Sequence, residues 1–296
     1  MQGLVLSIIF NLMLKLAELK KLFPERNKLS HKGDNGRVLV VGGSIDYYGA
    51  PIFSGLGSLY GGADLTYLAV PECNFDVSRS LYPDFVVKKY SGNYLNMNGF
   101  DMIMAMAQKC DVVVIGPGLG DREETLETVK NIVLKVGKTT ILDTKAMQVL
   151  QMIDQIPLPQ KIVITPHHLE FELLTGKSFK IQQGIEQKSA ILRTVAADMN
   201  INILLKGPQD ILVSERGEVQ VNTNGNAGMT VGGSGDVLAG LVGGLISQKI
   251  EPYDACLIAV YALGKAGDKL FKEKGYFYSA TDLANEIPYV LKDFVS

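Results

Sequence analysis

Short β-rich apolar runs alternate with helical patterns along nearly the whole chain, and this alternation constrains the fold more than any other feature. The continuous apolar run Val112–Ile115 is typical of a strand buried on both faces of a parallel sheet. Similar runs predict strands at Arg37–Val41, Thr66–Val70, Phe85–Lys88, Val112–Ile115, Thr140–Leu142, Ile162–Ile164 and Ile203–Leu205. Helical patterns lie between or after them at Pro51–Gly61, Glu123–Val136, Leu169–Leu174, Gly184–Met199, Asp236–Gln248 and Pro252–Lys272. The sequence therefore predicts an α/β protein whose mainly parallel sheet lies between layers of helices.

Two further runs, Ile211–Ser214 and Val219–Asn222, are joined by the short segment Glu215-Arg-Gly-Glu218. This spacing predicts an antiparallel hairpin near one edge of the sheet. The chain contains no low-complexity linker, no repeat and no break in composition. We therefore expect one domain over residues 32–296, preceded by an N-terminal helix or extension at residues 1–31.

Composition excludes several classes of function. A net charge of −2 and a pI near 6.0, without a basic run, argue against nucleic acid as a partner. The three cysteines (Cys73, Cys110 and Cys256) are too few and too widely spaced for a disulfide framework or a metal knuckle, which favours a reducing, cytoplasmic setting. The apolar run Leu4–Leu14 is interrupted by Asn11 and is too short to span a bilayer. Leu14, Leu16, Leu19 and Leu22, with charges between them, predict a helix packed on the domain just before the first strand. We therefore expect a buried N-terminal helix or an oligomer contact here, with no membrane role.

The glycine-dense segment Asn224–Asp236 ends in one carboxylate, directly before an amphipathic run. Glycine lets backbone N–H groups approach a ligand closely, and the start of a helix attracts anions such as phosphate. Asp236 would stand there as a general base able to take a proton from a hydroxyl group. The alternative is a glycine-rich turn in which Asp236 caps the helix.

Glycine-rich or polar residues follow five of the predicted strands. They are Gly42-Gly43-Ser44, Gly116-Pro-Gly-Leu-Gly120, Asp143, Thr165-Pro-His167 and Lys206-Gly207. In open α/β sheets ligands bind outside the carboxyl ends of the strands, so these five ends together predict a binding site at one edge of the sheet.

Each motif has a simpler reading when it is taken alone. Gly42-Gly43 lacks the full dinucleotide fingerprint and fits a tight turn. Gly116–Gly120 fits a βα connection or a contact to a ribose or base, because the acids that follow it would repel phosphate. His167 is a candidate hydrogen-bond donor to a substrate, while no nearby cysteine or third histidine supports a zinc site. Glu170 fits a first-turn acid, and Lys206 fits either a phosphate contact or a surface lysine.

In this order the motifs resemble the ribokinase-like superfamily, and within it the ADP-dependent NAD(P)H-hydrate dehydratases. The resemblance runs from about Lys32 to the C-terminus. It rests on Lys32–Ser44, Gly49-Ala50-Pro51, Gly116–Gly120, Asp143, Thr165-Pro-His167, Lys206-Gly207, Asn224–Leu238 and Ala280–Pro288. It implies a three-layer α/β/α sandwich with a mainly parallel central sheet.

The resemblance also implies an activity, nucleotide repair. The enzyme would dehydrate the S epimer of hydrated NADH or NADPH back to NAD(P)H at the expense of ADP, giving AMP and phosphate, with Mg²⁺ bridging the phosphates. Asp236 would be catalytic, and Ala50, Gly118, His167 and Asp236 would contact the hydrate. The nucleotide contacts would be Lys206, Gly207, Pro208, Gln209, Asp210, Gly233, Ser234 and Gly235.

The chain departs from the family pattern at three places. Leu169 stands where the family usually has glycine, Pro208-Gln-Asp210 replaces small residues, and Ser234 replaces threonine. An epimerase domain is often fused upstream in this family, and the residues before Lys32 are too few for one. We therefore expect the other epimer to depend on a separate epimerase or on spontaneous epimerisation. The resemblance further implies a homo-oligomer, with a tetramer as one form.

Two other functions remain open at the level of sequence. A kinase of the same fold would phosphorylate a hydroxymethyl vitamin precursor or a sugar with ATP and leave a stable phosphate ester. A regulator that binds nucleotides without catalysis would turn over no substrate. These motifs do not distinguish ADP from ATP as the nucleotide, or the NADH hydrate from the NADPH hydrate as the substrate.

Overall fold

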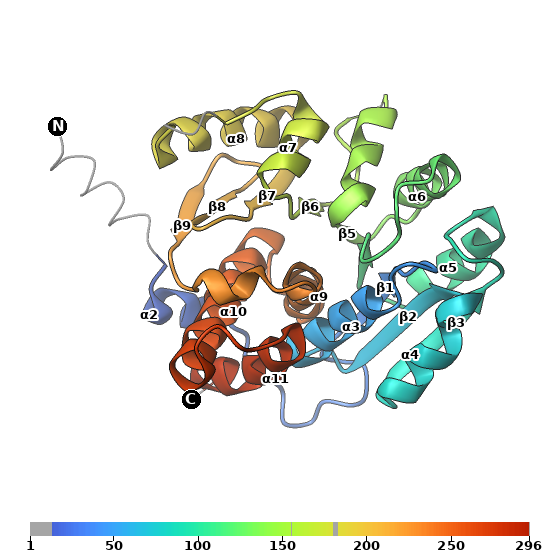
Figure 1. Cartoon of the computed structure of the whole chain (residues 1–296), viewed down its shortest axis with the longest axis horizontal. Helices are drawn as coiled ribbons and strands as arrows, with labels where there is room; N and C mark the ends of the chain where they lie inside the picture. The colour runs from blue at the N-terminus through green and yellow to red at the C-terminus, as the bar shows by residue number, and fades with distance from the viewer. Residues whose placement is uncertain (1–13, 155, 180–182, 296) are drawn as a thin grey trace, which may run out of the picture.

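A computed structural model describes residues 14–154, 156–179 and 183–295 of the chain. One nine-stranded sheet runs through the molecule in the order β3-β2-β1-β4-β5-β6-β7-β8-β9 (Figure 1). Its strands are β1 (Arg37–Val41), β2 (Leu65–Pro71), β3 (Phe85–Tyr90), β4 (Val112–Ile115), β5 (Thr139–Leu142), β6 (Ile162–Ile164), β7 (Ile201–Leu205), β8 (Asp210–Val213) and β9 (Val219–Asn222). The first seven strands pair in parallel, and β8 and β9 add an antiparallel hairpin at one edge.

Helices cover both faces of this sheet (Figure 1). The helices are α2 (Leu16–Leu19), α3 (Gly49–Tyr60), α4 (Phe75–Leu81), α5 (Phe100–Ala107), α6 (Glu123–Lys135), α7 (His168–Thr175), α8 (Ile185–Met199), α9 (Ser234–Ser247), α10 (Pro252–Lys274) and α11 (Ala280–Leu291). The 3₁₀ segments are η1 (Lys20–Leu22), η2 (Glu72–Asn74), η3 (Met97–Gly99), η4 (Thr144–Met152), η5 (Ala227–Thr230) and η6 (Lys292–Phe294).

The core consists of two apolar layers, one on each face of the sheet. Val38 and Val40 of β1 pack with α3, α9, α10 and α11, whereas Leu39 and Val41 pack with α5, α6, η4, α7 and α8. Successive side chains of a strand point to opposite faces, so a strand covered on both sides must be apolar at every position. The predicted three-layer α/β/α sandwich is therefore confirmed.

Most predicted elements form close to their expected bounds. The runs at β1, β4, β6 and β9 match at both ends, and the hairpin lies at the sheet edge as expected. Neither α4 nor α5 was predicted, because each has only seven or eight residues and shows too little periodicity to stand out. Most of Leu4–Leu14 lies outside the described residues, but the helical expectation just after it is met by α2, where Leu19 is buried.

No helix within the described parts of the chain is both long enough and apolar enough to cross a membrane.

Two glycine-rich faces bring α3 and α9 into close contact. A Cβ at Gly240 would collide with the carbonyl oxygen of Ser54, and a Cβ at Gly57 would collide with the carbonyl oxygen of Val237. The hydroxyl of Ser58 donates a hydrogen bond to the carbonyl of Gly240 at 3.1 Å across the same contact. Close packing of these helices fixes the start of α9, where Asp236 lies, against the middle of α3, where Gly57 meets Val237.

We expect Gly240→Ala to destabilise the fold by about 1–3 kcal/mol, because the added methyl group must push the two backbones apart. Gly184→Ala is the matched control, since a Cβ there meets no atom within 4 Å and the residue has a φ of −70°. Urea unfolding of both variants measures the difference. Equal stability of Gly240→Ala and the unaltered protein would contradict the packing argument.

Candidate active site

Three consecutive strand ends bring a partly buried ion pair together at the carboxyl edge of the sheet. Asp143 follows β5 and is fully buried. Its Oδ1 accepts a hydrogen bond from the Thr165 hydroxyl at 2.6 Å, and the Lys206 ammonium lies 3.2 Å from the same atom. Burying a charge is costly unless it is paired and hydrogen-bonded, so Thr165 and Lys206 make this position possible for Asp143.

The start of α7 adds a second carboxylate. His167 and Glu170 form a capping box, in which the His167 N–H donates to Glu170 Oε2 at 2.8 Å and the Glu170 N–H donates to His167 Nδ1 at 3.2 Å. Glu170 Oε2 also lies 3.9 Å from the Lys206 ammonium. Because Nδ1 accepts a hydrogen bond, the neutral His167 ring carries its proton on Nε2. Glu170 is therefore more than the first-turn acid expected from the sequence.

The surroundings of the neighbouring His168 indicate a role in packing. Burial lowers the pKa of His168, and the charges of Lys188 and His167 lower it further. Its ring packs against Phe179, with 5.2 Å between the ring centroids. Among the residues that the structure describes, no group of three or more His, Cys, Asp or Glu side chains could hold a metal ion.

Asp236 stands in the first turn of α9 and faces these charged groups. Burial raises the pKa of Asp236 to about 8, with a further rise from Asp143 and Glu170 that Lys206 opposes. Burial alone would lower the pKa of Lys206, but the carboxylates of Asp143 and Glu170 outweigh it and raise that pKa. The site thus holds three carboxyl groups around one ammonium, and burial and its neighbours make Asp236 a stronger base than an ordinary aspartate.

The helix is not capped by Asp236. Gly233 occupies the N-cap position with a φ of 97°, and no side chain makes a cap hydrogen bond there. The Lys206 ammonium reaches this helix start, since a Cβ at Gly235 would lie 3.4 Å from its Nζ. The first N–H groups of a helix have no acceptor within the helix, so together with an ammonium at the same helix start they make an anion site.

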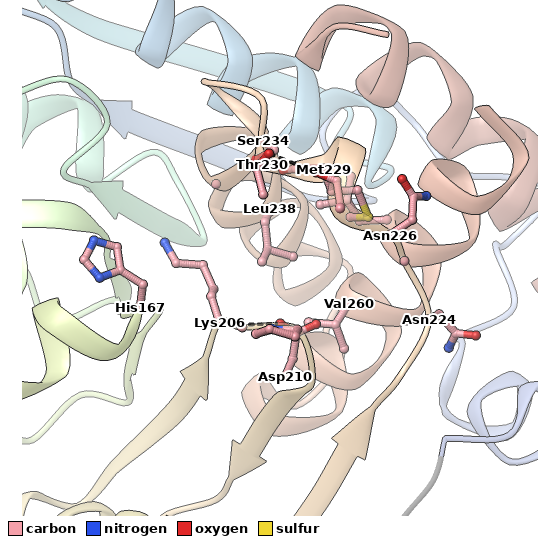
Figure 2. Close-up of a pocket in the computed structure, with 16 residues that line it drawn as sticks. His167, Lys206, Asp210, Asn224, Asn226, Met229, Thr230, Ser234, Leu238 and Val260 are labelled. Atoms are coloured by element: carbon pink, nitrogen blue, oxygen red, sulfur yellow. Dashed lines mark hydrogen bonds between the residues drawn. The ribbon is translucent and has the colours of Figure 1, made fainter. Parts of the chain in front are cut away.

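A cavity of about 660 Å³ opens beside this helix start. Figure 2 shows its lining, with His167 and Lys206 side by side at the ends of neighbouring strands. The cavity is lined by His167, Lys206, Gly207, Pro208, Asp210, Asn224, Gly225, Asn226, Ala227, Met229, Thr230, Ser234, Gly235, Leu238, Val260 and Leu263. Its lining is charged around Lys206 and apolar where Leu238 of α9 meets Val260 and Leu263 of α10.

The residues predicted from the sequence fall into three places. Most of the nucleotide candidates and His167 line the cavity, whereas Gln209 and Gly233 do not. Asp236 lies at the start of α9 beside Lys206. Ala50 and Gly118 form a separate group, since a Cβ at Gly118 would lie 2.9 Å from the Cβ of Ala50.

The two glycine loops after β1 and β4 support each other. Gly43 has a φ of 87°, and its N–H donates to the carbonyl of Pro117 at 2.8 Å. Gly118 has a φ of 70° and no room for a side chain between Ala50 and Tyr47. The tight-turn interpretation of Gly42-Gly43 therefore holds, and the Gly116–Gly120 loop approaches Ala50 closely.

Some residues of the cavity were missed as site candidates. Asn224, Asn226, Met229 and Thr230 lie in the glycine-dense segment that marked the site, so the sequence held a signal for them. Val260 and Leu263 lie inside the long helix α10 and carry no motif. Only the packing of α10 against α9 and the hairpin brings them to the cavity.

Comparison with known proteins identifies the family. A family model described as NAD(P)H-hydrate dehydratase matches residues 38–289. The chain is 34% identical to the ADP-dependent (S)-NAD(P)H-hydrate dehydratase of Cenarchaeum symbiosum, with 94% of this chain and 96% of that protein covered. It is 36% identical to the bifunctional NAD(P)H-hydrate repair enzyme Nnr of Pyrobaculum aerophilum over 90% of this chain. The chain spans about half of that relative's length (52%).

A solved structure agrees with the sequence relatives. The ADP/ATP-dependent NAD(P)H-hydrate dehydratase of Bacillus subtilis, co-crystallized with ATP/Mg²⁺, has a TM-score of 0.80 and 26% identity, with 95% of this chain and 97% of that chain covered. With the match over residues 38–289, these likenesses show that the chain belongs to the ribokinase-like NAD(P)H-hydrate dehydratase family.

Proposed function

We propose that this protein is an ADP-dependent (S)-NAD(P)H-hydrate dehydratase, which returns hydrated NADH and NADPH to NAD(P)H. The observation that carries the proposal is the first turn of α9, where Asp236 and the Lys206 ammonium meet and where burial raises the pKa of the Asp236 carboxyl group to about 8. The relative from Cenarchaeum symbiosum bears this name and is covered over nearly its whole length.

The reaction needs a better leaving group than hydroxide. Asp236 takes the proton of the hydrate's hydroxyl group while the hydroxyl oxygen bonds to the β-phosphorus of ADP, and the bond between that phosphorus and AMP breaks. The phosphorylated carbon–oxygen bond then breaks, phosphate leaves, and loss of a ring proton restores the dihydronicotinamide. A base with a raised pKa suits the first step, because it accepts a proton near neutral pH.

The other residues position and neutralise charge. Lys206 and the backbone N–H group of Gly235, in the first turn of α9, would hold the phosphates, which need positioning and electrostatic stabilisation more than covalent help. The walls around Pro208 and Asp210 would hold the nucleoside. Ala50, Gly118 and His167 would contact the hydrate, as the family resemblance implies.

Mg²⁺ fits this site only together with the nucleotide. No ready-made cluster of three metal ligands exists among the described residues, so phosphate oxygens and water would supply most of its coordination. When bound, the ion neutralises the charge that develops on the phosphates. The Bacillus subtilis relative was co-crystallized with ATP/Mg²⁺, which supports this assignment.

Two associations belong to the same proposal. The bifunctional relatives combine repair activities in a longer chain, which supports a separate NAD(P)H-hydrate epimerase as a functional partner for this one. A homo-oligomer, with a tetramer as one form, follows from the family resemblance, and equilibrium sedimentation measures it directly.

We expect purified protein, mixed with Mg²⁺, NADH hydrate and ADP, to restore the near-ultraviolet absorbance of dihydronicotinamide and to release AMP. Reactions with ATP or without nucleotide are run in parallel. Absence of recovery with either nucleotide would sink the proposal, and a stable phosphate ester formed from a hydroxymethyl compound would point to the kinase instead.

We expect Asp236→Asn to lower turnover by about 10²–10⁴-fold, the typical contribution of a general base. Its affinity for ADP should remain close to that of the unaltered protein, because the amide keeps the shape of the side chain and Lys206 remains in place. Calorimetric titration with ADP and the absorbance assay measure the two quantities separately. Retained turnover would remove Asp236 from the role of base.

A further inference from the structure

Asp210 begins β8 and lines the cavity, in the segment where this chain departs from the small residues of its family. Oδ1 accepts a hydrogen bond from the Gly207 N–H at 3.1 Å, and Oδ2 accepts one from Asn222 Nδ2 at 3.0 Å. These two bonds fix the plane of the carboxylate. Each oxygen can accept a second hydrogen bond, so the group is oriented and still able to bind a ligand.

The position of Asp210 along the cavity is defined by its neighbours. The bond from the N–H of Gly207 places the carboxylate of Asp210 beside the residue that follows Lys206. Burial raises the pKa of Asp210, against the hydrogen bonds from Asn222 and Gly207 and the charge of Lys206. The Asn222 amide that bonds Asp210 also donates to the carbonyl of Val260 at 3.4 Å. Asp210 thus lies between the ammonium of Lys206 and the apolar wall that includes Val260, as Figure 2 shows.

A nucleoside diphosphate can lie in this cavity in one orientation that gives each of its parts a suitable environment. Its phosphates belong beside Lys206 and the start of α9, and its base belongs against the apolar side chains of Leu238, Val260 and Leu263. The ribose then lies level with Asp210. Its hydroxyl groups are hydrogen-bond donors, and an acidic side chain is a common partner for them in nucleotide sites.

We propose that Asp210 accepts a hydrogen bond from the ribose hydroxyls of the nucleotide and makes the site selective for nucleotides that carry these hydroxyls. This inference rests on the proposed use of ADP, but not on the repair reaction itself. A hydrogen bond to a charged group in a partly buried site contributes about tenfold or more to a dissociation constant.

The test is calorimetric titration of the full chain with ADP and with 2′,3′-dideoxy-ADP, both with Mg²⁺. We expect the dideoxy nucleotide to bind the unaltered protein about tenfold or more weakly. Asp210→Asn should remove most of this difference. Asp198→Asn, the same substitution on the exposed surface of α8, is the matched control and should retain the difference in full.

Equal affinity of the unaltered protein for the two nucleotides would overturn the inference whatever the variants do. So would a difference that survives in Asp210→Asn. Should that variant fail to fold, Asp210→Ser keeps a small acceptor for the Gly207 N–H and should also lose the difference.

The inference and the proposed function fail in different ways. Selective binding of ADP without repair of the hydrate would support the role of Asp210 and sink the dehydratase. Repair of the hydrate with equal affinity for both nucleotides would do the reverse.

Discussion

The site depends on one ion pair, between the buried Asp143 carboxylate and the partly exposed Lys206 ammonium. Asp143 is fully buried after β5, and Lys206 follows β7, so the pair links strand ends that are two places apart in the sheet. A buried charge that lost its partner would be strongly destabilising, so the pair fixes the ammonium where the start of α9 needs it. The cavity, the anion site and the environment of Asp236 all follow from this position.

The same arrangement weakens the fold at high pH. Asp236 has a folded pKa of about 8 against an ordinary value of 3.8, so the unfolded chain gives up this proton more readily than the folded protein. Its contribution to stability is therefore largest below pH 3.8 and falls as pH rises to about 8. A carboxyl group whose raised pKa lowers the stability of the fold at neutral pH is more typical of a functional position than of a structural one.

Much of this could be predicted from the sequence, because buried parallel strands are apolar throughout and their ends are marked by abrupt polar or glycine residues. Val112–Ile115 and the residue Asp143 after β5 are examples. The sequence could not place Val260 in the cavity, because nothing in the pattern of α10 separates a cavity wall from ordinary core. It also left open whether Asp236 caps α9, which depends on the backbone conformation of Gly233.

The most direct test of the central claim is the pH dependence of hydrate repair with ADP, measured with both at low concentration. If deprotonated Asp236 is the base, the rate should rise about tenfold per pH unit from pH 6 and level off near pH 8, where its pKa lies. A rate that is constant between pH 6 and pH 8 would contradict the account, because it would mean that the working base is already deprotonated at pH 6.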